Sequence, residues 1–107
     1  MSRLFSEIIT LIKKGDVFIS SHGYDELAND NIYVKEIFET IDVAEVINEY
    51  PDYSKGPCVL VLQKDKAGKP VHVVWGIPKN SKSPAVLVTA YRPDPERWND
   101  DFLRRKK

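Results

Sequence analysis

Two strand-like runs near the C-terminal end constrain the fold of this chain most strongly. They span residues 71–78 and 85–93, and both are rich in β-branched and other apolar side chains, which favour strands. Four polar side chains interrupt or close these runs: His72, Thr89, Tyr91 and Arg92. An imidazole, a phenol and a guanidinium on neighbouring strands predict a functional site on a sheet.

The residues before these runs extend the sheet. Residues 58–63 read as a strand, and the turn sequence 65–69 joins it to the run 71–77 as a hairpin. Residues 43–50 fit a helix, but residues 46–50, just before Pro51, could equally form an edge strand, because a short apolar run does not distinguish the two. We choose the strand.

The first half of the chain predicts three helices. Apolar residues recur at helical spacing through 2–14, and further helices are expected over 22–29 and 34–40. Ser2 is a suitable N-cap for the first helix, Ser20 or Ser21 for the second, and Gly15 is suitable for ending the first helix. Residues 17–19 are interpreted as a short extended link.

Helices followed by a meander of strands predict an α+β fold, with the N-terminal helices packed on one face of a small antiparallel sheet. At 107 residues the chain is expected to form one domain, 1–107. Residues 94–107 are expected to form a short C-terminal helix and a basic tail. No apolar run is long enough for a membrane helix, and Cys58 is the only cysteine, which fits the reducing cytoplasm.

The net charge of zero hides a strong asymmetry. Residues 1–54 hold 4 basic and 11 acidic side chains, whereas residues 55–107 hold 12 basic and 5 acidic ones. The second half therefore carries a charge of +7, which could attract phosphate groups, although the charges of the two halves could also mix in space.

Side-chain alternation assigns the strand residues to two faces. The simplest assignment turns six apolar residues toward the helices: Leu60, Leu62, Val73, Trp75, Val86 and Val88. The opposite, open face then carries Gln63, His72, Thr89 and Tyr91, with Arg92 at the strand end. A slip of one residue in the register would reverse a whole strand.

Several short motifs resemble those of a known family. They are Ser21-His22 with Glu26, EYPDY at 49–53, KGP at 55–57, PVHVVWG at 70–76 and PAVLVTAYRPDP at 84–95. The chain resembles, over about residues 17–98, a bacterial family of small domains of unknown function allied to RelE-like and MqsR-like toxins. The resemblance implies a RelE-like fold and a metal-independent endoribonuclease without a cofactor. It also implies an antitoxin partner, often a zinc-finger and helix-turn-helix protein.

The resemblance marks His22, His72, Thr89 and Tyr91 as recurrent polar positions. Metal-free RNA cleavage needs a base, an acid and a cation. His22 or His72 would transfer protons with Glu26 as an alternative base, Tyr91 would stack or donate, and Arg92 would hold phosphate. Thr89, Gln63, Lys55 and Lys79 are the expected substrate-binding residues. Two histidines and one cysteine at wide spacing predict no metal site.

Each of these residues also has a structural interpretation. His72 would then be a hydrogen-bonded, half-buried histidine and Tyr91 a packing residue, while His22 would bond the backbone of its helix. Two further functions stay open. One is a non-catalytic module that binds protein or RNA through the same open face, and the other is a small-molecule enzyme on this scaffold.

Overall fold

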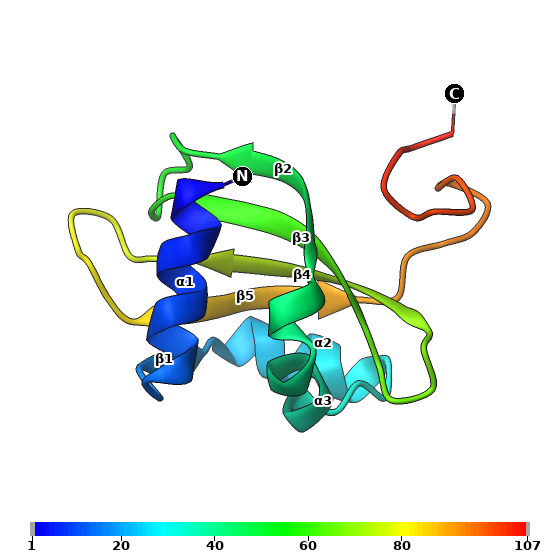
Figure 1. Ribbon diagram of the computed structural model, residues 1–107, viewed down its shortest axis with the longest axis horizontal. Coiled ribbons are helices and arrows are strands. Elements are labelled where there is room, and N and C mark those ends of the chain that lie inside the picture. The colour runs from blue at the N-terminus through cyan, green and yellow to red at the C-terminus, as the bar shows by residue number, and fades with distance from the viewer. Residues whose placement is uncertain (1, 107) are drawn as a thin grey trace.

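The computed structural model describes residues 2–106, which fold into three α-helices, one 3₁₀ helix and five strands (Figure 1). In chain order these are α1 (Arg3–Lys13), β1 (Val17–Ile19), α2 (Ser21–Asn29), α3 (Val34–Glu39), the 3₁₀ helix (Ile41–Val43), β2 (Glu45–Tyr50), β3 (Cys58–Lys64), β4 (Pro70–Gly76) and β5 (Ala85–Tyr91). The α+β class is confirmed, and so is the strand interpretation of residues 46–50.

The sheet is open and mixed, with strand order β1-β5-β4-β3-β2. Strands β2 to β5 pair antiparallel with one another, as expected, but β1 pairs with β5 in parallel, from Val17 opposite Ala85 to Ile19 opposite Leu87. The expectation of a purely antiparallel sheet, with 17–19 as a link, was therefore wrong in this detail. Three residues are too few to show the alternation that marks a strand.

Helices α1 and α2 begin where capping serines predict, and α1 ends at its expected glycine. Ser2 Oγ accepts a hydrogen bond from Phe5 N–H at 3.0 Å, and Ser20 Oγ accepts one from Gly23 N–H at 2.9 Å. Gly15, just beyond α1, adopts φ 79°, a left-handed conformation that glycine tolerates best.

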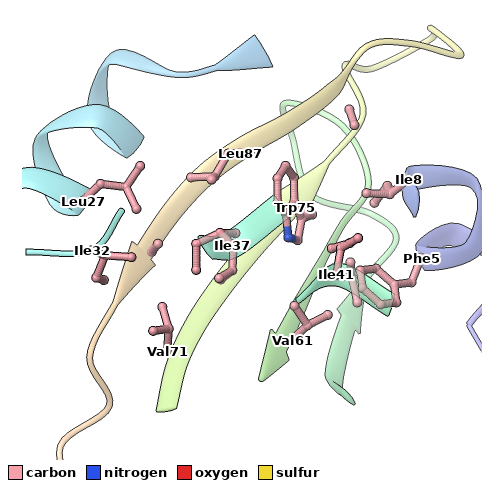
Figure 2. Packing of buried hydrophobic residues seen from close by; sticks show 14 of the residues in the cluster. Phe5, Ile8, Leu27, Ile32, Ile37, Ile41, Val61, Val71, Trp75 and Leu87 are labelled. Atoms are coloured by element: carbon pink, nitrogen blue, oxygen red, sulfur yellow. The ribbon is translucent and has the colours of Figure 1, made fainter. Parts of the chain in front are cut away.

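The hydrophobic core lies between the helices and one face of the sheet. Phe5 and Ile8 of α1, Leu27 of α2 and Ile37 of α3 are all buried there. Figure 2 shows Trp75 standing between the helices, with Ile37 and Ile41 beside it. We call the opposite surface of the sheet the far face.

The pairing register corrects the expected faces of β3 and β5. Val59 pairs with Trp75 and Val61 with Val73, so Val59 and Val61 face the helices. Leu60 and Leu62, which we expected on that side, lie on the far face.

In β5 the register shifts between the partners of Val74 and Trp75. Leu87 is consequently buried on the helix side in place of Val86 and Val88, while Thr89 and Tyr91 stay on the far face as expected. A bulge of this kind leaves no signal in a simple alternation pattern.

The C-terminal segment, residues 94–106, contains no helix, so the expectation of a short helix was wrong. Asp94 and Asp101 accept bonds from backbone N–H groups two residues on, which favours turns over a helix. Trp98 and Arg105 form an antiparallel bridge that closes the segment (Figure 1, orange to red). Lys107, the end of the expected basic tail, lies outside the described residues.

Candidate functional site

The far face carries two separate groups of candidate residues. The first surrounds a groove of about 600 Å³ at one end of the sheet. Its floor comes from the neighbouring positions Cys58, Gly76 and Val86 on β3, β4 and β5. Its walls and rim come from Phe18, Ser20, His22, Tyr53, Lys55, Gly56, Ile77, Pro78, Pro84 and Val88. The lining is largely apolar and aromatic, with an imidazole and an ammonium group among the exceptions.

Two loops meet tightly on one side of this groove. Gly56, at φ 132°, lets the loop 53–57 approach the backbone that follows β4. A Cβ atom on residue 56 would lie only 2.1 Å from the Ile77 carbonyl oxygen, so a larger residue does not fit there. Lys79 N–H donates to the Lys55 carbonyl oxygen at 3.0 Å. The structure therefore brings the backbones of these two lysines together, with Lys55 lining the groove and Lys79 next to it.

His22 lies on the opposite side, in the first turn of α2. Gly23 holds this turn close to β5, because a Cβ there would come within 2.9 Å of the Leu87 carbonyl oxygen. Ser20 Oγ donates to the Val88 carbonyl oxygen at 2.9 Å and fixes the turn further. The His22 side chain is 67% exposed, and its Nε2 lies 3.9 Å from Glu26 Oε1. His22 is thus an accessible imidazole at the groove with a carboxylate beside it.

The second group centres on His72, whose side chain is completely buried beneath the C-terminal segment. Its Nε2 lies 2.8 Å from the Phe102 carbonyl oxygen, and its Nδ1 lies 3.4 Å from the Tyr91 hydroxyl. Trp98 packs edge-on against the imidazole, with 4.4 Å between the ring centroids. The expected open surface at His72 is therefore covered in this structure.

Burial sets the protonation of this group. Desolvation lowers the pKa of His72 below its usual value, and the charge of Arg105 lowers it further, while the bond to the Phe102 carbonyl partly opposes both. A neutral imidazole with Nε2–H donating to Phe102 and Nδ1 accepting from Tyr91 satisfies both ring atoms. Burial also raises the pKa of Tyr91, so both groups are uncharged near pH 7.

Arg92 follows Tyr91 in the chain but points to the β3–β4 hairpin. Its Nη1 lies 2.8 Å from Asp65 Oδ2, and its backbone N–H donates to Asp30 Oδ2 at 2.9 Å. Burial alone would raise the pKa of Asp65, yet bonds from Lys69 N–H and the charge of Arg92 hold it below its usual value. The guanidinium that we expected to hold phosphate is paired with a carboxylate here.

Gln63 lies on the helix face, not on the far face as expected, because the register of β3 is shifted by one residue from our assignment. Its Nε2 donates to the Ile37 carbonyl oxygen at 2.7 Å, and its Oε1 accepts from Trp75 Nε1–H at 2.9 Å. Gln63 is 1% exposed and is a core residue. Thr89 remains on the far face, partly buried, opposite Val74.

The predicted site is thus divided. His22 and Lys55 line the groove, with Glu26 beside His22, while His72 and Tyr91 form the covered group. Gly76 in the groove floor and His72 are four residues apart on β4, so the two groups lie about 13 Å from each other on one face.

Several residues of these sites were not predicted from the sequence. Phe18 and Tyr53 line the groove, and Trp98 and Phe102 cover His72. Tyr53 could have been proposed as a binding residue, because it is an aromatic side chain in a polar loop between two strands. Nothing local indicated that Trp98 folds back across the sheet.

Residues 2–106 contain no cluster of potential metal ligands. Within that range no three His, Cys, Asp or Glu side chains lie close enough to hold a metal ion together. Cys58 is buried in the groove floor, and burial raises its pKa, which disfavours the thiolate. Among the same residues, no helix has the length and apolar character to cross a membrane.

Comparison with known proteins places the chain in a family. No curated protein and no solved structure matched the sequence. One family model matched residues 19–92, which is more than half of the chain and includes β2 to β5, the groove floor and His22. The match ends at Arg92, so residues 94–106 lie beyond it. The chain therefore belongs to the family described as a domain of unknown function, DUF4258.

Proposed function

We propose that this protein is an RNA-directed toxin, a metal-independent endoribonuclease that acts at the groove beside His22 and is held inactive by an antitoxin. The exposed imidazole at the mouth of a groove that also holds Lys55 is the observation that carries this proposal. The motif resemblance to RelE-like and MqsR-like toxins supports it, and the antitoxin would be a zinc-finger and helix-turn-helix protein. The cytoplasm, where RNA is abundant, is the proposed site of action.

The groove has the chemistry that a nucleotide requires. Aromatic and apolar walls from Phe18, Tyr53 and Pro84 suit the planar face of a base. The ammonium group of Lys55 suits a phosphate, because contacts to RNA backbones come chiefly from such cations.

His22 would supply the proton transfer. A neutral imidazole removes the proton of a 2′-hydroxyl group, whose oxygen then attacks the adjacent phosphorus and forms a 2′,3′-cyclic phosphate. The bond to the 5′-oxygen breaks, and that oxygen takes a proton from Lys55 or from water. Glu26, 3.9 Å away, would orient the imidazole and stabilise its protonated form.

The proposal is tested with purified protein and single-stranded RNA in EDTA. We expect products with 2′,3′-cyclic phosphate ends, and a loss of about 10²-fold or more in rate for His22→Ala, as for other acid–base groups. Tyr24→Ala is the matched control, since Tyr24 is 59% exposed on the same helix. Growth arrest on expression should be relieved by the same His22 change. A wild-type protein that neither cleaves RNA nor arrests growth would refute the proposal.

A second candidate is a non-catalytic module that binds RNA or protein through the groove. The largely apolar lining favours it, because such walls give affinity without any proton transfer. In that case His22→Ala retains affinity for the partner, and no turnover occurs under any condition. A neighbouring gene that encodes a small zinc-finger protein would instead favour the toxin.

A further inference from the structure

The C-terminal segment, residues 94–106, presents two groups to His72 that together resemble a ligand. The indole of Trp98 meets the imidazole edge-on at 87° and 4.4 Å between centroids. The Phe102 carbonyl oxygen lies 2.8 Å from Nε2 of the same ring. A nucleobase such as uracil offers the same two kinds of group, a planar ring and a carbonyl oxygen.

This segment folds on itself more than it bonds to the sheet. Its backbone is closed by Asn99 N–H donating to Arg104 O at 2.8 Å and by Lys106 N–H donating to Arg97 O at 2.9 Å. Across residues 2–106, its only hydrogen bond to the rest of the protein is the one between Phe102 and His72. Moving the segment away would therefore break no hydrogen bond of the sheet ladder.

The conformation of Phe102 is specialised for this contact. Its φ of 57° lies in the left-handed region, which a bulky residue adopts only when its surroundings hold it there. The Phe102 N–H donates to the Asn99 carbonyl oxygen at 2.8 Å, which fixes the turn. The result is a carbonyl oxygen directed at a buried imidazole.

We propose that residues 94–106 cover a second RNA-binding site, which accepts a base carrying a carbonyl oxygen against His72, in the place that Trp98 and the Phe102 carbonyl now occupy, and that a bound strand displaces the segment. Tyr91, with its ring centroid 5.4 Å from that of His72, forms the second wall of this site. Arg105, whose guanidinium carbon lies 5.3 Å from the centre of the Trp98 ring, is released when the segment moves and becomes available to phosphate.

This inference rests on the proposed function for the choice of RNA as the ligand. The two sites lie about 13 Å apart on the far face, a span of four residues along β4. A single strand that enters the groove beside His22 would therefore reach His72. The covering segment would block RNA from the His72 ring until the bound RNA displaces it.

The test measures affinity and does not depend on cleavage. Fluorescence anisotropy is recorded with short 2′-O-methyl oligouridine, which lacks the attacking hydroxyl group, and with the matching oligoadenosine, whose base has no carbonyl oxygen. Trp98→Ala removes the ring that holds the segment in place, and Trp98→Phe is the matched control that keeps an aromatic ring. Circular dichroism establishes that each variant is folded.

We expect Trp98→Ala to bind oligouridine about tenfold more tightly than the wild type, with Trp98→Phe unchanged and a gain of less than about threefold for oligoadenosine. A folded Trp98→Ala variant with wild-type affinity would overturn the proposal. Equal gains in affinity for oligouridine and oligoadenosine would overturn the proposal that the site recognises a base carbonyl, because the gain would then reflect charge alone.

A second measurement uses the unaltered protein, in case Trp98→Ala does not fold. The indole N–H resonance of Trp98 in a ¹H–¹⁵N spectrum should shift on saturation with oligouridine, because the segment leaves His72. A resonance that stays in place at saturation contradicts the displacement. Both binding measurements stay interpretable if His22 does not catalyse cleavage. The proposed nuclease activity and the proposed second site can therefore be refuted independently.

Discussion

Replacing Gln63 with leucine should destabilise this protein more than its position near a strand end suggests. Gln63 is 1% exposed, and its amide is shared between the sheet and α3. Its Oε1 accepts from Trp75 Nε1–H at 2.9 Å, and its Nε2 donates to the Ile37 carbonyl oxygen at 2.7 Å. Leucine has a similar volume but can make neither bond, so two buried polar groups lose their partner.

The magnitude follows from those two groups. An unsatisfied buried donor or acceptor costs about 1–3 kcal/mol, so Gln63→Leu should lower the free energy of unfolding by about 2–4 kcal/mol after the added apolar contacts. For a chain of 107 residues this is a large part of the total stability, which is about 5–15 kcal/mol for a protein domain. The melting temperature should fall by about 10 °C or more.

Urea unfolding of four proteins measures this effect: the wild type, Gln63→Leu, Trp75→Phe and the double variant. Trp75→Phe removes the indole N–H, so it should cost about 1 kcal/mol less when Gln63 is already leucine. Lys64→Leu, an exposed neighbour on β3, is the control and should change stability by less than about 0.5 kcal/mol. A loss below about 0.5 kcal/mol for Gln63→Leu, or strict additivity with Trp75→Phe, would refute the network.

Two further predictions concern the loops and the covered imidazole. Gly56→Ala should cost about 2 kcal/mol or more, because its Cβ would meet the Ile77 carbonyl oxygen at 2.1 Å, whereas Gly68→Ala, with nothing within 4 Å, should cost about 1 kcal/mol. Thermal melts compare the two variants, and equal losses would show that the loop contact is unimportant. Burial lowers the pKa of His72, so the unfolded chain binds this proton more readily, and stability should fall as the pH drops below about 6.5. Urea unfolding at several pH values measures this fall, and NMR titration showing a His72 pKa above its usual value would contradict it.

The elements of the fold were largely predictable because their signals are local. Helical periodicity, the caps at Ser2 and Ser20 and the hairpin turn at 65–69 each depend on residues close in the chain. The α+β class followed from their order. The parallel strand β1 did not, because a three-residue strand is defined by its partner β5 and not by its own pattern.

The sequence indicated which types of residue the candidate site contains, but not how they are arranged in space. His22 and Lys55 line one groove with Glu26 beside His22, yet His72 lies under Trp98 and Gln63 lies in the core. A bulge and a register shift of one residue decide such placements, and both depend on contacts between strands.

The sequence by itself therefore determined most of the helices and strands, apart from β1 and the C-terminal segment, since propensity, spacing and capping act over a few residues. The tertiary structure alone decided which polar residues of the two late strands are exposed. His72 is covered because the C-terminal segment turns back and places Trp98 and Phe102 against it, some 30 residues away in the chain. Arg92 is directed to Asp65 of the hairpin, a contact that only the paired strands bring within 2.8 Å. Long-range packing of this kind has no local signal, because its free energy arises only once the sheet has formed.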